Sequence, residues 1–130
     1  MLLAYDNYIL GGILMKIAIA SEGNVVSGHF GHCEGFTLYE IHDKKITNKT
    51  KIANPGHKPG FLPKFLNEKD VNVIVSGGMG GRAQNLFNEN GIEVVVGAEG
   101  DCDDVANKYV KGELKYSESV CHEHKHHEEC

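Results

Sequence analysis

The stretch VNVIVSGGMGGRAQNLFNENGIEVVVGAEGD, residues 71–101, indicates the fold class of this chain most clearly. Two largely apolar runs, Val71–Ser76 and Ile92–Val96, flank a segment with helical spacing, Arg82–Asn90. Gly91 directly follows that segment, and glycine commonly ends a helix. Continuous apolar strands are typical of parallel strands that helices cover on both faces. The stretch therefore predicts a strand–helix–strand unit of an α/β domain.

Segments on either side complete the predicted sheet. Lys16–Ala20 predicts a first strand, and Phe36–His42 with Lys45–Ala53 predicts a β-hairpin. Phe61–Lys69 has helical apolar spacing, and Asp101 can cap a last helix that runs through Val110. We therefore predict an α/β fold with a mixed five-stranded sheet and helices on both faces.

Length and composition are those of one ordinary globular domain. The chain has 130 residues, of which 41% are hydrophobic and 24% charged, so it can bury one core. The formal net charge of −5 disfavours non-specific binding to nucleic acid. No apolar run approaches the roughly 20 residues that span a membrane, and no signal-peptide pattern is evident. We therefore expect a cytoplasmic protein with no nucleic-acid or membrane partner.

Three segments are expected along the chain. Residues 1–14 precede the first strong strand pattern and are predicted to be an extension. Met15 is a candidate natural start, because Gly11-Gly12 can be encoded by a ribosome-binding sequence. Residues 15–115 are predicted to form the domain. Residues 116–130 hold two cysteines and four histidines without a core pattern, and we expect this tail to be mobile without a ligand.

The loops that follow the parallel strands are predicted to open on one edge of the sheet, where α/β proteins bind ligands. The first loop carries histidine, glycine and cysteine together, and the third ends in a cysteine. Soft metals and iron–sulfur clusters prefer imidazole and thiolate ligands. The predicted metal ligands are His29, His32, Cys33 and Cys102, with Gly31 in the cofactor-binding loop. We expect a lowered pKa for Cys102 near a helix N-terminus; a hydrogen-bonded structural histidine is the alternative for His29.

The second loop is rich in glycine. It lacks both the lysine of a nucleotide-binding loop and the GxGxxG pattern. Glycines let the backbone approach a bulky ligand, and amides at a helix start favour an anion such as a metal–sulfide cluster. The predicted cofactor-binding residues here are Ser76, Gly77, Gly78, Met79 and Gly80. A tight strand-to-helix turn explains the loop equally well, and a hydrophobic lid is favoured over a soft ligand for Met79.

The tail offers a separate group of metal-ligating side chains. Its predicted ligands are Cys121, His122, His124 and Cys130, with His126 and His127 nearby. Such side chains can form a tetrahedral site for a divalent metal, although the spacing matches no standard zinc module. A local metal site is the favoured interpretation. A flap over the edge site and a solvated tail are the alternatives.

Catalysis finds little support in the sequence. Cys33 could pair with His29 or His32 as nucleophile and base, but side chains so close on one turn rarely align for this. No serine triad signature is evident. The alternative function is a thiol- or metal-dependent redox enzyme, or a redox regulator, that uses Cys33 and Cys102.

Two long motifs resemble one known family. MKIAIASEGNVVSGHFGHCEGF, residues 15–36, and VIVSGGMGGRAQNLFNENGIEVVVGAEGD, residues 73–101, resemble the dinitrogenase iron–molybdenum cofactor biosynthesis family. This family includes NifX-like proteins and the C-terminal domain of NifB-type proteins. The resemblance implies a ribonuclease H-like three-layer fold. It also implies a small carrier or chaperone of iron–sulfur or iron–molybdenum-type clusters, with a cluster donor or acceptor protein as partner. His29 is the implied cluster contact, and the second family loop is matched by Gly77, Gly78 and Gly80.

Overall fold

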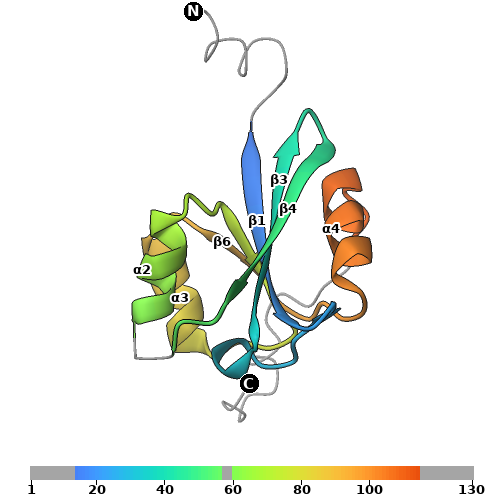
Figure 1. Cartoon of the computed structure of the whole chain (residues 1–130). Coiled ribbons are helices and arrows are strands. Elements are labelled where there is room, and N and C mark those ends of the chain that lie inside the picture. Colours follow the sequence, from blue (N-terminus) through green and yellow to red (C-terminus); the bar gives the residue numbers. More distant parts are fainter. Residues whose placement is uncertain (1–13, 57–59, 115–130) are drawn as a thin grey trace, which may run out of the picture.

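The computed structural model describes residues 14–56 and 60–114, which form one α/β unit (Figure 1). Every predicted strand and helix is present within a few residues of its predicted ends. The first loop additionally contains a short strand and a 3-10 helix. In chain order the elements are β1 (Met15–Glu22), β2 (Val25–Val26), η1 (Phe30–His32), β3 (Gly35–His42), β4 (Lys45–Ala53), α2 (Phe61–Glu68), β5 (Val73–Val75), α3 (Gly81–Glu89), β6 (Glu93–Val95) and α4 (Cys102–Lys111).

The sheet is mixed and has the strand order β4-β3-β1-β5-β6. β1 pairs in parallel with β5, and β5 with β6, whereas β3 runs antiparallel to both β1 and β4. The two-residue β2 adds a sixth strand by pairing with the end of β1. The three parallel strands therefore end at one edge of the sheet, as the apolar runs predicted.

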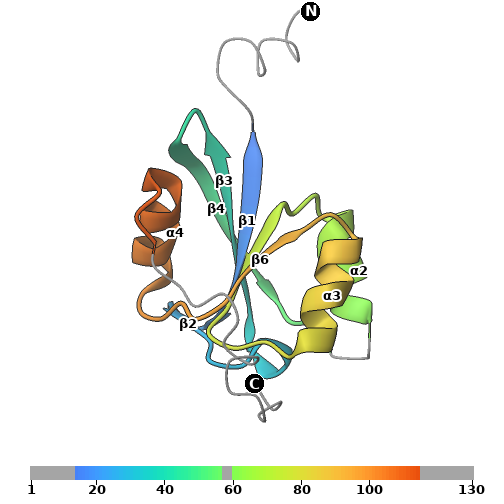
Figure 2. The same ribbon diagram turned by 180° about the vertical axis from the view of Figure 1, so that it is seen from behind.

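Alternation of side chains along the strands divides the core into two layers. In β1, Ala18 and Ala20 pack with side chains of α2 and α3, whereas Ile17 and Ile19 pack with side chains of α4. Figures 1 and 2 show α2 and α3 on one side of the sheet and α4 on the other. Helices therefore cover both faces, and the sheet itself separates the side chains of the two core layers.

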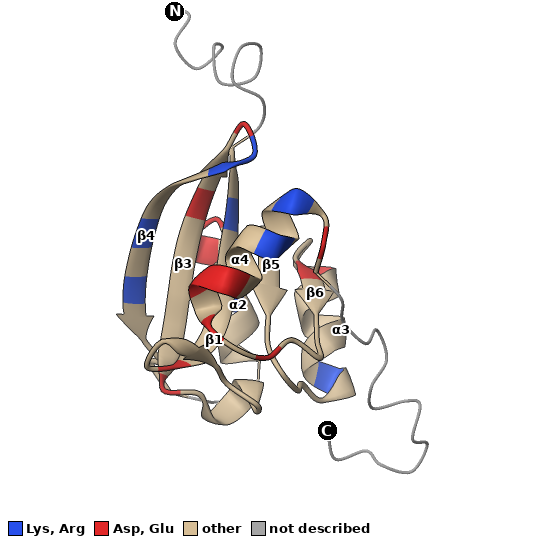
Figure 3. Ribbon diagram, turned by 90° about the vertical axis from the view of Figure 1, so that its right-hand side faces the viewer, with Lys and Arg blue, Asp and Glu red and all other residues tan. Residues whose placement is uncertain are grey.

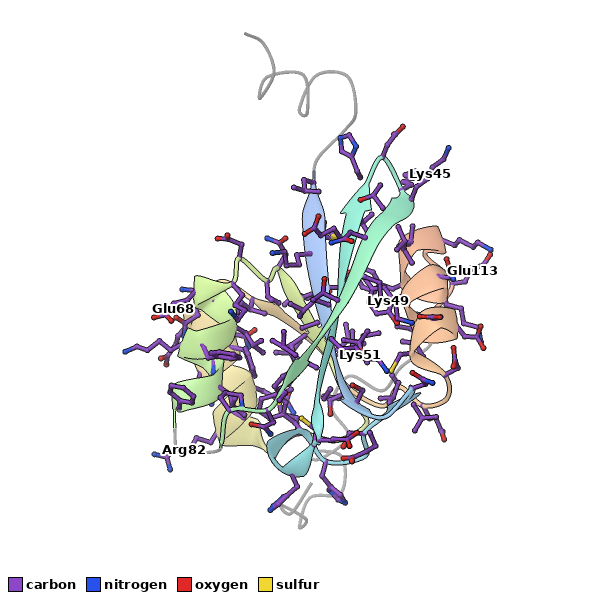
Figure 4. The ribbon with its side chains drawn as sticks, in the orientation of Figure 1. Lys45, Lys49, Lys51, Glu68, Arg82 and Glu113 are labelled. Carbon is purple, nitrogen blue, oxygen red and sulfur yellow. The ribbon has the colours of Figure 1, made fainter. Side chains whose placement is uncertain are left out.

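Hydrogen bonds and charge attach the start of α4 to the antiparallel hairpin. Asp101 caps the helix by accepting from the backbone N–H groups of Asp103 and Asp104. The Asp103 carboxylate accepts a hydrogen bond from Tyr39 Oη at 2.7 Å and pairs with Lys49 Nζ at 2.8 Å. Figure 3 shows the acidic start of α4, and Figure 4 shows Lys49 on the β4 side of that helix. These contacts hold α4 in its layer.

Some predictions concern residues outside the described part of the chain. These are the N-terminal extension apart from Leu14, and the tail with Cys121, His122, His124 and Cys130. Within residues 14–56 and 60–114, no helix combines the length and the apolar composition needed to cross a bilayer.

Candidate functional site

Three loops meet at the edge where β1, β5 and β6 end. Two backbone hydrogen bonds join the first two loops: Gly77 N donates to Ser27 O at 2.8 Å, and Phe30 N donates to Gly78 O at 3.0 Å. The loop after β6 joins them because Gly97 N donates to Gly77 O at 2.9 Å. The predicted convergence of the loops is therefore confirmed for the backbone.

Gly77 and Gly78 are required by the contact between these loops. A Cβ atom on Gly77 would lie 2.9 Å from Gly28 Cα, and one on Gly78 would lie 2.7 Å from Gly28 O. Ser76 is fully buried, and its Oγ donates to Gly78 O at 2.9 Å. These glycines therefore allow the loop after β1 to pack closely against the loop after β5. Neither sequence-based interpretation of the glycines, as a ligand-binding loop or as a tight turn, included this contact.

A pocket of about 230 Å³ lies between the loop after β1 and the loop after β5. Its lining residues are His29, Phe30, Gly31, His32, Gly78, Met79 and Gly80. The side chains of His29 and His32 are exposed, whereas Phe30 and Met79 are buried. The structure thus brings together most residues predicted for cofactor binding, with two imidazoles at the rim and an apolar base.

Phe30 is the lining residue that sequence interpretation missed. Its ring packs edge-on against Phe87 of α3, with centroids 5.2 Å apart, and lies 5.9 Å from the ring of Phe36. Phe30 stands alone among glycines and histidines and has no apolar neighbours at helix or strand spacing. The pattern of apolar residues therefore did not indicate that it is buried. Met79 belongs to the same core cluster, so it contributes to the base of the pocket and not to the predicted lid.

Cys33 lies in the core layer of α2 and α3, outside the pocket lining. Its side chain is 4% exposed, and Asn54 Nδ2 donates to Cys33 O at 2.9 Å and to its Sγ at 3.7 Å. Burial, together with the negative charge of Glu22, raises the pKa of the thiol to about 11, although the Asn54 hydrogen bond acts in the opposite direction. Cys33 is therefore a neutral thiol near neutral pH.

Cys102 begins α4 and lies in the opposite core layer. Burial is the main cause that raises the pKa of its thiol, and Asp101 and Asp103 add to it, whereas a hydrogen bond with Thr37 lowers it. The predicted lowering of this pKa is wrong, because removal of water from the thiolate and the charges of Asp101 and Asp103 outweigh the effects that lower it.

The structure therefore does not bring Cys33 and Cys102 together with the two histidines. The sheet separates the two sulfurs, which belong to different core clusters. Across the described ranges 14–56 and 60–114, no group of three or more His, Cys, Asp or Glu side chains is placed to hold a metal ion.

Both described cysteines are expected to alkylate slowly in the folded protein. Near neutral pH, Cys33 should react with iodoacetamide at least about 100-fold more slowly than in urea, because the thiolate is the reactive form and burial blocks access. Mass spectrometry of proteolytic peptides measures each cysteine separately. Reaction of Cys33 at its unfolded rate in the native protein would contradict its placement beneath the pocket loop.

The start of α3 gives one end of the pocket a positive electrostatic potential. Gly80 lines the pocket and caps α3 without a side-chain hydrogen bond, and the first turn of α3 contains no acidic residue. Arg82 lies in this first turn, and Figure 4 places it at the lower end of the helix pair. By contrast, α4 is capped by Asp101. Backbone N–H groups and the helix dipole at the start of α3 therefore favour an anion in the pocket.

The sequence matches one family model over almost all of the described unit. The model described as "Dinitrogenase iron-molybdenum cofactor" matches residues 14–112. The chain belongs to the dinitrogenase iron–molybdenum cofactor family. The resemblance predicted from the two long motifs is thus confirmed. The match includes every pocket residue of this family member and ends before the tail.

Similar proteins extend over most of the same region. The uncharacterized protein MJ0580 of Methanocaldococcus jannaschii is 32% identical over 107 residues, which cover 78% of this family member and 91% of the relative. The crystal structure of PH0822 has 32% identity and a TM-score of 0.75, and covers 79% of this chain and 95% of that chain. The crystal structure of MJ0327 of Methanocaldococcus jannaschii has 26% identity and a TM-score of 0.67, and the match covers 81% of this chain and 96% of that chain.

Proposed function

We propose that this protein is a small cytoplasmic carrier that holds a metal–sulfur cluster and passes it to a partner protein. The cluster, of the iron–sulfur or iron–molybdenum type, would bind in the pocket at His29 and His32. The observation that carries the proposal is this pocket, in which two exposed imidazoles lie beside the start of α3. Membership of the dinitrogenase iron–molybdenum cofactor family supports the class of cargo.

The chemistry of the pocket suits an anionic cluster. The imidazoles of His29 and His32 are common ligands of transition metals, and His29 is the contact that the family resemblance implies. The N–H groups at the start of α3, beside the pocket residue Gly80, would stabilise the negative charge of a sulfide-rich cluster. Phe30 and Met79 give the pocket an apolar base, which reduces the access of water to bound metal.

The exposure of the two imidazoles also suits transfer of the cargo. A donor or acceptor protein could reach a cluster held at the rim without any opening of the core. The redox alternative is less well supported, because Cys33 and Cys102 are buried on opposite faces of the sheet. We therefore favour binding over catalysis. The ribonuclease H-like character of the fold is retained as part of this proposal, and the mixed sheet covered on both faces is compatible with it.

Anaerobic reconstitution with ferrous iron and sulfide tests the proposed carrier function. The wild-type protein is expected to become coloured. The His29→Ala variant is expected to retain the cluster at least about tenfold less well, because even the loss of a residue that only supports a metal ligand costs about 10–100-fold in affinity. Absorption spectra and the content of iron and sulfide measure the difference.

His42→Ala is the matched control, because His42 ends β3 at the opposite end of the sheet from the pocket. This variant is expected to bind like the wild type. A colourless wild-type protein, or equal losses in the two histidine variants, would contradict the proposed site.

A further inference from the structure

The strand β4 forms one edge of the described sheet and pairs with β3 on one side only. It has nine residues, whereas β6 at the other end of the sheet has three. An edge strand presents a row of backbone N–H and C=O groups to which another strand can bind. β4 is therefore the longer of the two edges at which the sheet can be extended.

The pairing of β3 with β4 fixes which backbone groups lie on the free side of β4. Asn54, directly after β4, faces β3, because its N–H group donates to Glu34 O at 3.1 Å. The backbone groups of successive residues in an antiparallel strand point alternately to its two sides. Every second residue of β4 therefore bonds to β3, and the residues between them face away. The N–H groups on the free side belong to the exposed residues Lys49, Lys51 and Ala53.

Lysine side chains make the free edge basic. β4 contains Lys45, Lys49 and Lys51 and no acidic residue, and Figure 4 shows these lysines along the strand. Lys51 Nζ donates to a neutral oxygen, Asn24 Oδ1, at 2.7 Å. Lys49 Nζ pairs with Asp103 at 2.8 Å, but both side chains of this pair are exposed. Since an ammonium group has three donors, each of these two lysines can also bind a carboxylate that arrives from the free side.

The acidic start of α4 lies on the side of β4 that faces the sheet. α4 packs over β1 and β3. Figure 3 shows its acidic first turn beside β3, with the basic residues of β4 farther out at the edge of the molecule. A strand added to β4 would therefore have the lysines between itself and the acidic groups Asp103 and Asp104.

A hollow of about 230 Å³ adjoins the end of this free edge. Its lining includes Ser21, Gly35 and Ala53, which are aligned across β1, β3 and β4. Lys51 also lines it. A peptide that extends a sheet gains affinity from main-chain hydrogen bonds and specificity from sites for alternate side chains. The hollow offers such a site next to the backbone groups of the free edge.

Pairing between two copies of β4 is disfavoured by the same lysines. Antiparallel pairing about a two-fold axis can be centred on residue 49, 50 or 51. These registers place Lys49 opposite Lys49, Lys49 opposite Lys51, or Lys51 opposite Lys51. Like charges directly opposite each other in a sheet are destabilising. The free edge therefore favours an acidic strand over a second copy of this chain.

We propose that β4 is a docking edge for an extended acidic segment of another protein, which adds a strand to the sheet. The backbone of this segment would bond to Lys49, Lys51 and Ala53. Acidic side chains two residues apart would pair with the two lysines, because residues i and i+2 of a strand lie on one face. The docking edge shares no residue with the pocket lining, so this inference does not depend on the proposed function.

Amide hydrogen exchange measured by NMR tests the docking edge directly. The probe is a synthetic peptide of alternating glutamate and threonine, added to the protein without iron or sulfide. With about 90% of the protein occupied, exchange at Lys49, Lys51 and Ala53 should slow about tenfold, because only the free tenth exchanges. The N–H groups of Thr50 and Ile52 already bond to β3 and should change much less.

Charge reversal tests the role of the lysines. The Lys49→Glu/Lys51→Glu variant is expected to bind the acidic peptide at least about tenfold more weakly. It should also bind a peptide of alternating lysine and threonine more tightly than the wild type does. The control Lys64→Glu/Lys111→Glu changes the net charge equally at exposed positions of α2 and α4, and should bind the acidic peptide within about twofold of the wild type, because salt screens distant charges. Fluorescence anisotropy measures binding, and circular dichroism checks the fold.

Three results would overturn the inference. The first is no binding of the acidic peptide to the wild type at about 1 mM. The second is binding without the alternating protection along β4, because this result describes a general attraction for polyanions, nucleic acid included. The third is equal weakening in the two double variants. Should the variant at Lys49 and Lys51 fail to fold, exchange in the wild type still decides. Because no iron or sulfide is present, none of these results bears on the carrier proposal.

Discussion

Replacing Phe30 with alanine is expected to lower the free energy of unfolding by about 3–5 kcal/mol, the usual cost of deleting a buried aromatic ring. Phe30 is 6% exposed and packs edge-on against Phe87, which is itself fully buried. Truncation leaves a cavity between the pocket and α3. Because the same ring forms the base of the pocket, we also expect His29 and His32 to lose their relative placement, and cluster retention to fall with stability.

Urea denaturation followed by circular dichroism measures this loss for Phe30→Ala. Phe61→Ala is the matched control, because Phe61 is 37% exposed at the start of α2, and surface substitutions usually cost less than about 1 kcal/mol. Similar losses in the two variants would show that Phe30 does not anchor the pocket loop to the core.

The Gly78→Ala variant is expected to lose about 1–3 kcal/mol of stability, as overpacked sites do, and to lose cluster binding as well. The added Cβ would lie 2.7 Å from Gly28 O, which is a backbone atom and cannot rotate away. The two loops must therefore separate, and the 3.0 Å hydrogen bond from Phe30 N to Gly78 O must lengthen. Both loops line the pocket, so the separation would widen it.

Gly81→Ala provides the control for Gly78→Ala within the same glycine-rich stretch. A Cβ on Gly81 would meet no atom within 4 Å, and alanine is the better residue in a helix by about 1 kcal/mol. This variant should therefore unfold at the wild-type urea concentration or above it, and should keep its cluster. Equal stability of the Gly78 and Gly81 variants would refute the steric role assigned to Gly78.

Most of the fold could be predicted because its signals are local. The alternation in Phe36–His42 and the apolar run in Val71–Ser76 each reflect the surroundings of a single strand. Asp101 indicates the start of a helix through its side chain, and Gly91 indicates the end of a helix because it has none. The first loop was harder to predict, because β2 has only two residues and forms by pairing with β1 and by a bridge from Val25 to Asp101, which meets it only once the chain folds.

The candidate site was predicted in part. His29, Gly31, His32 and the loop Gly78–Gly80 could be grouped, because parallel strands place their following loops at one edge. Phe30 could not be recognised as the base of the pocket, since its partner Phe87 is distant in sequence. The pKa of Cys102 was predicted in the wrong direction, because position at a helix start is visible in a sequence and burial is not.

The α/β class, the order of the elements and the edge at which the loops gather could all be predicted from the sequence alone. These properties follow from periodicities within single segments and from the direction of parallel strands. Three-dimensional packing, by contrast, set which of the histidines and cysteines at that edge are accessible. It placed His29 and His32 at the surface, and it buried Cys33 and Cys102 in opposite layers. Exposure could not be predicted because it depends on atoms contributed by distant segments, and because a sheet separates the residues that pack on its two faces.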